Sequence, residues 1–143
     1  DAQYSESPEV YAANLDRLVR KIDGMVTDLP APVREEGDGT LGIIAFGTTD
    51  WAVQEVIASL KDKPSYLRIR SYPFHDEVDS FICDHDQILV IEQNQQGQMA
   101  QLLRLNNPQV AAKIQSATYY GGLPLSARFV KDAIEQQQGV VAK

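Results

Sequence analysis

The chain has 143 residues, 43% hydrophobic and 23% charged, which is enough for one globular domain with a sizeable core. Its 20 acidic and 13 basic side chains give a formal net charge of −7, which argues against non-specific nucleic-acid binding, because that needs a basic surface. The single cysteine, Cys83, excludes an internal disulfide and a cysteine-only zinc or iron–sulfur cluster within this chain.

The first residues are polar and acidic, unlike a secretory signal. No apolar run approaches the roughly 20 residues that span a bilayer. The chain begins with Asp1 rather than methionine, so it is either processed or a piece of a longer protein. We therefore expect a cytoplasmic protein that binds neither membranes nor nucleic acid.

An amphipathic helix is predicted from Pro8 to about Val26. Ser7 can cap it, and Glu9 lies near the positive end of its dipole. Its apolar residues recur at spacings of three and four: Tyr11, Leu15, Leu18, Ile22 and Met25. This stripe packs either on the chain's own sheet or on protein outside the chain. We expect it to dock on a preceding domain, and otherwise to fold back on the sheet or pair with another copy.

Residues 29–40 are predicted to be a linker, because they are rich in proline and charge and end in a glycine-containing turn. A short edge strand near Val33 is compatible with this composition. We therefore divide the chain into residues 1–40, a helix and linker, and residues 41–143, an α/β domain.

The first buried strand is predicted at residues 41–46, followed by Gly47-Thr48-Thr49 at the start of a helix. Such a turn can hold an anion on free backbone N–H groups, so Gly47, Thr48 and Thr49 are a possible anion site. Alternatively, Thr49 or Asp50 simply caps the helix. The GxGxxG and GxxxxGK[ST] nucleotide motifs are absent.

The next strand, at residues 66–70, alternates apolar and basic side chains, which predicts one more exposed face. A short helix follows, on which Cys83 is expected to be a small packed hydrophobe. Four potential metal ligands flank this helix without a recognisable ligand spacing, so no metal site is predicted. They are His75, Asp76, His85 and Asp86.

The four consecutive aliphatics of residues 88–91 predict a strand in the middle of a sheet that is covered on both faces. A polar turn follows, and helical spacing resumes from about Gln96 to Leu105. Asn94 suits the turn or the helix cap, and Gly97 permits a close approach of the backbone.

Glu92 comes at the carboxyl end of this central strand, where open α/β sheets place their functional groups. We expect its carboxylate to point out of that edge, beside Gln98 in the first helical turn. The edge residues Glu92, Asn94, Gly97 and Gln98 are therefore interface candidates. The alternative is an ordinary strand-to-helix junction that serves only this domain.

The rest of the chain predicts a short helix at 109–114, a weaker strand at 116–120 and a last helix containing Ala127, Val130 and Ile134. Four strand–helix units with short connections imply a mainly parallel sheet with helices on both faces, a three-layer αβα fold. No catalytic triad or acid–base pair stands out by spacing, so no catalytic residue is assigned.

Three stretches together carry a resemblance to a known family: residues 41–49 (LGIIAFGTT), 91–98 (IEQNQQGQ) and 120–127 (YGGLPLSA). In this order, with Tyr72-Pro73-Phe74 between the first two, they resemble the C-terminal part of the alpha subunit of 2-oxoacid:ferredoxin oxidoreductases. The 2-oxoglutarate branch, 2-oxoglutarate synthase, matches best. Gly121 departs from the acidic residue expected before Gly-Leu-Pro.

The resemblance implies a domain like the C-terminal domain of transketolase, with a five-stranded mixed sheet whose first strand is antiparallel. It also implies a parent enzyme that uses thiamine diphosphate, Mg and an iron–sulfur cluster to decarboxylate a 2-oxoacid oxidatively, with coenzyme A as a substrate and ferredoxin as the acceptor. Those cofactors would lie on other alpha-subunit domains and on the beta subunit. This segment would be structural, inactive alone and free of cofactor.

A second hypothesis is a free-standing α/β module that binds a small molecule or anion, using residues 47–49 and 94–98 at neighbouring strand ends. The sequence upstream of Asp1 discriminates between the two hypotheses. Long thiamine-enzyme domains there favour the oxidoreductase segment, and a start codon favours the module.

Overall fold

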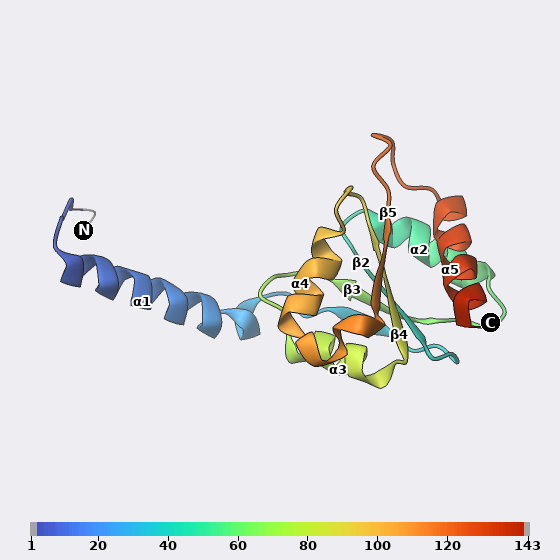
Figure 1. The fold of residues 1–143 in the computed structure, drawn as a ribbon, viewed down its shortest axis with the longest axis horizontal. Helices are drawn as coiled ribbons and strands as arrows, with labels where there is room; N and C mark the ends of the chain where they lie inside the picture. Colours follow the sequence, from blue (N-terminus) through green and yellow to red (C-terminus); the bar gives the residue numbers. More distant parts are fainter. Residues whose placement is uncertain (1–2, 142–143) are drawn as a thin grey trace.

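A computed structural model describes residues 3–141 and places five strands in one sheet between two layers of helices (Figure 1). The strand order is β1-β3-β2-β4-β5, with β1 antiparallel to β3 and the other neighbours parallel. The strands are β1 (Val33–Glu35), β2 (Leu41–Phe46), β3 (Ser65–Ile69), β4 (Gln87–Glu92) and β5 (Ile114–Thr118). The predicted three-layer αβα fold with a mainly parallel sheet is confirmed, and so is the antiparallel first strand.

The described residues also form five α-helices and two short 3₁₀ turns. The helices are α1 (Pro8–Gly24), α2 (Thr49–Ser59), α3 (Asp76–Asp84), α4 (Gln98–Asn106) and α5 (Ala127–Val141). The 3₁₀ turns are η1 (Val26–Asp28) and η2 (Pro108–Lys113). None of the described helices is both long and apolar enough to cross a membrane.

Each face of the sheet has its own hydrophobic core. Helices α2 and α5 pack over one face, where Val53, Val130 and Ile134 meet the strands. Helices α3 and α4 cover the other face, where Phe81 and Leu103 are fully buried. Because both faces are covered, β2 and β4 tolerate almost no polar residue, which explains their aliphatic sequences.

The two central strands diverge at their carboxyl ends. From β2 the chain crosses through α2 to β3 on one side, whereas from β4 it crosses through α4 to β5 on the other side. The turns that leave β2 and β4 therefore run to opposite faces of the sheet. This makes the carboxyl edge between them a topological switch point, the usual place for a site in an open α/β sheet.

Helix α1 projects away from the sheet domain (Figure 1). It starts as predicted, because Pro8 follows Ser7, whose hydroxyl accepts the Val10 N–H at 3.4 Å. No residue of α1 is buried, and the side chains of its apolar stripe remain between 42% and 67% exposed at Tyr11, Leu15, Leu18 and Ile22. The helix therefore does not fold back on the sheet.

Three local expectations need correction. Strand β3 is buried on both faces except at the half-buried Arg68, because helices cover the whole sheet. Cys83 is exposed, since Phe81 and Ile82 take the inward positions on α3. Because β1 pairs with β3, a domain boundary at residue 41 falls inside the sheet domain, which starts at Val33.

Candidate functional site

Glu92, the last residue of β4, lies inside the molecule. Its side chain follows Ile88 and Val90 onto the α4 face and has no solvent exposure. The carboxylate accepts the backbone N–H groups of Met99 at 2.8 Å and Ala100 at 3.3 Å. The expectation that Glu92 points out of the sheet edge is therefore wrong.

Two side chains complete the hydrogen bonds of this buried carboxylate. Asn94 donates its amide N–H to one oxygen at 2.8 Å, and the Ser116 hydroxyl of β5 donates to the other at 2.8 Å. A negative charge is stable here because it sits at the positive end of α4 and receives four donors. Glu92 thus ties together β4, β5 and the start of α4.

Asn94 and Gly97 shape the turn between Glu92 and α4. The Asn94 side-chain oxygen accepts the N–H groups of Gln96, Gly97 and Gln98 at 3.1, 2.7 and 3.1 Å, so Asn94 holds the turn as its side chain predicts. Gly97 has φ +67°, and a Cβ there would lie 3.0 Å from the Ser116 hydroxyl. The predicted close backbone approach is present.

The second turn, after β2, is built differently. Gly47 has φ +61° with open space around it, and Thr48 occupies the N-cap of α2 without a side-chain capping bond. The expected cap through Thr49 or Asp50 is absent, because the Asp50 carboxylate faces β3. It accepts the Tyr66 hydroxyl at 2.9 Å and pairs with Arg68 at 3.0 Å.

Tyr66 is a buried phenol in this second arrangement. Burial raises its pKa well above the ordinary tyrosine value, and the hydrogen bond to the Asp50 carboxylate raises it further. The phenol therefore stays neutral and acts as a donor to Asp50 throughout the physiological range. Its role is to fix α2 against β3.

Gln93 connects the two turns across the switch point. Its side chain points to the opposite face from Glu92, and its amide donates to the hydroxyls of Thr48 at 3.4 Å and Thr49 at 3.2 Å. These hydroxyls belong to the predicted anion site. Beside this edge, Gln98 is exposed and Asn94 is half-buried.

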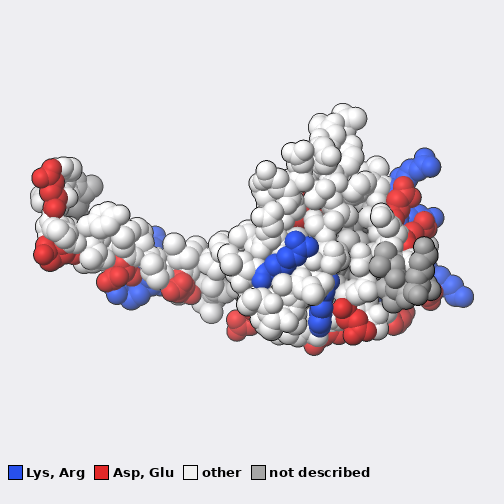
Figure 2. Space-filling model, in the orientation of Figure 1, with Lys and Arg blue, Asp and Glu red and all other residues white. Residues whose placement is uncertain are grey.

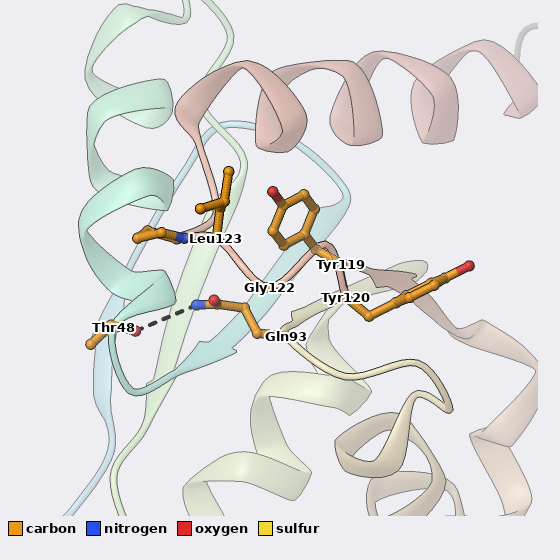
Figure 3. Close-up of a pocket in the computed structure, with 7 residues that line it drawn as sticks. Thr48, Gln93, Tyr119, Tyr120, Gly122 and Leu123 are labelled. Atoms are coloured by element: carbon orange, nitrogen blue, oxygen red, sulfur yellow. Dashed lines mark hydrogen bonds between the residues drawn. The ribbon is translucent and has the colours of Figure 1, made fainter.

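An open hollow of about 670 Å³ lies where Gln93 meets the loop after β5 (Figure 3). No charged side chain lines it. Its walls combine amide and hydroxyl groups with aromatic and aliphatic surface from Thr48, Gln93, Tyr119, Tyr120, Gly122, Leu123 and Pro124. This arrangement suits a neutral, partly apolar group rather than an anion.

The sequence analysis did not single out Gln93, Tyr119 or Leu123. Gln93 follows Glu92 directly at the end of a central strand. Because successive side chains of a strand point to opposite faces, the sequence could have predicted that Gln93 and Glu92 lie on opposite faces of the sheet. The loop after β5 entered the sequence analysis through the family resemblance of residues 120–127, not as the wall of a site. Among residues 3–141, no group of three His, Cys, Asp or Glu side chains is placed to hold a metal ion.

No protein-family model matches this sequence, and neither does any curated protein. Among solved structures, the fold is similar to that of "2-oxoglutarate:ferredoxin oxidoreductase from Magnetococcus marinus with 2-oxoglutarate, coenzyme A and succinyl-CoA bound", with a TM-score of 0.68 at 24% sequence identity. The match covers 92% of this chain and 24% of that one, so the chain spans about a quarter of its length. The chain therefore shares its fold with one part of that oxidoreductase.

Proposed function

We propose that this chain is the C-terminal structural and assembly segment of the alpha subunit of a 2-oxoacid:ferredoxin oxidoreductase, with 2-oxoglutarate as the favoured substrate. The parent reaction is oxidative decarboxylation to an acyl-CoA, with electrons passing to ferredoxin. The sequence motifs at residues 41–49, 91–98 and 120–127 support this proposal independently of the fold. The segment itself supplies no catalytic residue.

The observation that carries the proposal is the extent of the structural match. A coverage of 92% of 143 residues is about 132 residues, whereas only 111 residues run from Val33 to the end of the chain. The similarity therefore extends beyond the sheet domain into part of the first 32 residues, where α1 lies. A chance likeness between α/β sheets would not include a helix that touches neither face of the sheet.

The chemistry of the segment fits a supporting role. Glu92 and Asp50 are both engaged in internal hydrogen bonds, so neither is available to a substrate. The sequence lacks the glycine-rich motifs that hold phosphates. In this proposal, as the family resemblance implies, thiamine diphosphate, Mg and the iron–sulfur cluster belong to the remaining alpha-subunit domains and the beta subunit.

The test is to place an affinity tag at residue 143 in the native cell and purify the polypeptide that carries the segment. We expect a longer alpha subunit with its beta subunit, and reduction of a viologen dye that requires both 2-oxoglutarate and coenzyme A. The 143-residue chain alone should show neither this turnover nor tight thiamine diphosphate binding by calorimetry. Recovery of a free 143-residue protein without activity would overturn the proposal.

The alternative, a free-standing binding module, is favoured by one observation: the hollow at the switch point, where α/β proteins usually bind ligands. Its neutral lining points to an uncharged ligand and away from an anion. Saturable binding of a small neutral metabolite by the isolated chain, lost in Gln93→Ala, would favour this alternative over the enzyme segment.

A further inference from the structure

The two edges of the sheet differ sharply in charge. The loops that leave β2, β4 and β5 at the carboxyl edge, residues 47–49, 93–98 and 119–126, contain no charged side chain, whereas the loop after β3 carries the exposed Arg70. In Figure 2 the loop that projects furthest from the sheet carries no red or blue atoms. The amino edge instead exposes six charged residues, namely Asp38, Lys61, Asp62, Lys63, Asp84 and Asp86.

The same carboxyl edge exposes large apolar side chains. Trp51 at the start of α2 is 75% exposed, Tyr120 is 65% exposed and Leu123 is 70% exposed. Tyr72, after β3, is 58% exposed beside them. Strands β2, β4 and β5, which carry the uncharged loops, are neighbours in the sheet and span two strand spacings, or about 10 Å, so these loops lie along one part of the edge.

The net charge of −7 keeps the chain soluble, and an uncharged edge adds nothing to that solubility. Depletion of charge together with exposed tryptophan and tyrosine is the composition of the buried centre of a protein–protein interface. The hollow lined by Thr48, Gln93 and Leu123 lies in the middle of this edge and has a neutral lining. It can accept an apolar projection from a partner, while the Gln93 amide and the Thr48 hydroxyl can hydrogen-bond to it.

We propose that this carboxyl edge, defined by Trp51, Gln93, Tyr120 and Leu123, is the docking surface for a neighbouring folded domain of the same enzyme. The inference rests on the proposed function. The partner is a domain rather than a second copy, because the matched oxidoreductase chain is about four times as long as the matched part. An uncharged surface fits an equally uncharged one, since a charged group buried against it would lose its hydration without gaining a partner.

The position of α1 agrees with this choice. The Ser71 hydroxyl donates to the Pro30 carbonyl at 3.0 Å, so the segment that follows α1 reaches the sheet domain at the carboxyl end of β3. The segment that carries the exposed helix therefore enters the sheet domain at the carboxyl edge. A domain attached through α1 would lie within reach of that edge.

Two matched leucines allow a controlled test. Leu123 is 70% exposed at the carboxyl edge, and Leu105 is 75% exposed near the end of α4, at the amino edge. Leu123→Arg and Leu105→Arg would be made in the tagged, full-length enzyme and in the 143-residue chain. Interdomain protection at residues 119–126 would be followed by hydrogen exchange, and the oligomeric state of the isolated chain by native mass spectrometry.

We expect Leu123→Arg to lower protection of residues 119–126 at least tenfold in the enzyme, and Leu105→Arg to leave it unchanged. In the isolated chain, the loop should exchange rapidly in every variant. Equal protection in both variant enzymes would overturn the docking surface while the proposed function stands. Purification of a monomeric chain with no larger polypeptide would overturn both, and a dimer of the isolated chain that Leu123→Arg dissociates would overturn the choice of partner.

Discussion

The two central strands end in turns that look alike in sequence and differ in construction. Each turn contains a glycine with positive φ, Gly47 after β2 and Gly97 after β4, and each has an acidic residue nearby. After β4, the Glu92 carboxylate turns inward and holds the N-terminus of its own helix. After β2, the Asp50 carboxylate does not cap its own helix and instead binds Tyr66 and Arg68 on β3.

The difference follows from what packs beside each turn. The turn after β4 is backed by β5, whose Ser116 supplies a donor and restricts the space around Gly97. The turn after β2 opens into the switch point, where no further strand approaches Gly47 within 4 Å. One turn is therefore packed and self-sufficient, and the other remains open to solvent and to a partner.

Glu92→Gln should give the largest loss of stability. The amide keeps the size of the side chain but has one acceptor oxygen in place of two. Either the Met99 N–H and the Asn94 amide, or the Ala100 N–H and the Ser116 hydroxyl, then face an N–H donor in place of an acceptor. We expect a cost of about 3 kcal/mol, or roughly a 10 °C lower Tm in the isolated chain. Thermal unfolding followed by circular dichroism measures this, with the exposed Gln95→Ala in the same turn as control. A shift below 2 °C would mean that the carboxylate is not needed there.

Gly97→Ala should come next, at about 2 to 3 kcal/mol. A side chain at φ +67° costs about 1 to 2 kcal/mol, and the new Cβ also meets the Ser116 hydroxyl at 3.0 Å. Because Ser116 holds Glu92, the substitution should also loosen that contact. Urea unfolding gives the free energy of unfolding directly. A cost no greater than that of Gly47→Ala would show that the packing around Gly97 yields freely.

Tyr66→Phe should cost about 1 kcal/mol at neutral pH, through the lost hydrogen bond to Asp50. The pKa of Tyr66 is raised in the native state, so its contribution is complete below the ordinary tyrosine pKa of about 10 and is lost as the pH rises further. Wild type should therefore lose stability more steeply than Tyr66→Phe between about pH 10 and 11. Parallel urea-unfolding curves across this range would contradict the assignment.

Gly47→Ala should have the smallest effect, at about 1 kcal/mol, because only the positive φ opposes it and nothing lies within 4 Å of the new Cβ. Urea unfolding of the isolated chain gives the free energy of unfolding of Gly47→Ala and of Gly97→Ala. The difference between the two variants measures the contribution of packing around Gly97. In the full enzyme, the cost should rise if a partner domain closes the switch point. A larger cost than Gly97→Ala in the isolated chain would reverse the comparison.

The strands at residues 41–46 and 88–91 were predictable because a strand covered by helices on both faces is apolar along nearly its whole length. Asn94 and Gly97 could be assigned to the turn from their chemistry alone. The inward orientation of Glu92 could not, because a strand that is apolar on both faces does not show which face its last residue takes. That orientation depends on Ser116, 24 residues away on β5. Cys83 was misplaced for a related reason, since three adjacent apolar residues cannot all face inward on one short helix.

The antiparallel direction of β1 decides at which edge of the sheet the preceding segment enters the domain. Had β1 run parallel to β3, the polypeptide would enter the sheet domain at the charged amino edge. Its reversal brings the entry point to the carboxyl end of β3. A domain linked through α1 would then face the neutral edge at an effective concentration that short linkers commonly raise to about the millimolar range. For the proposed docking surface, contacts that are too weak to hold two separate molecules together would then suffice. The direction of the three-residue strand β1 would in this way lower the affinity that the interface itself must supply.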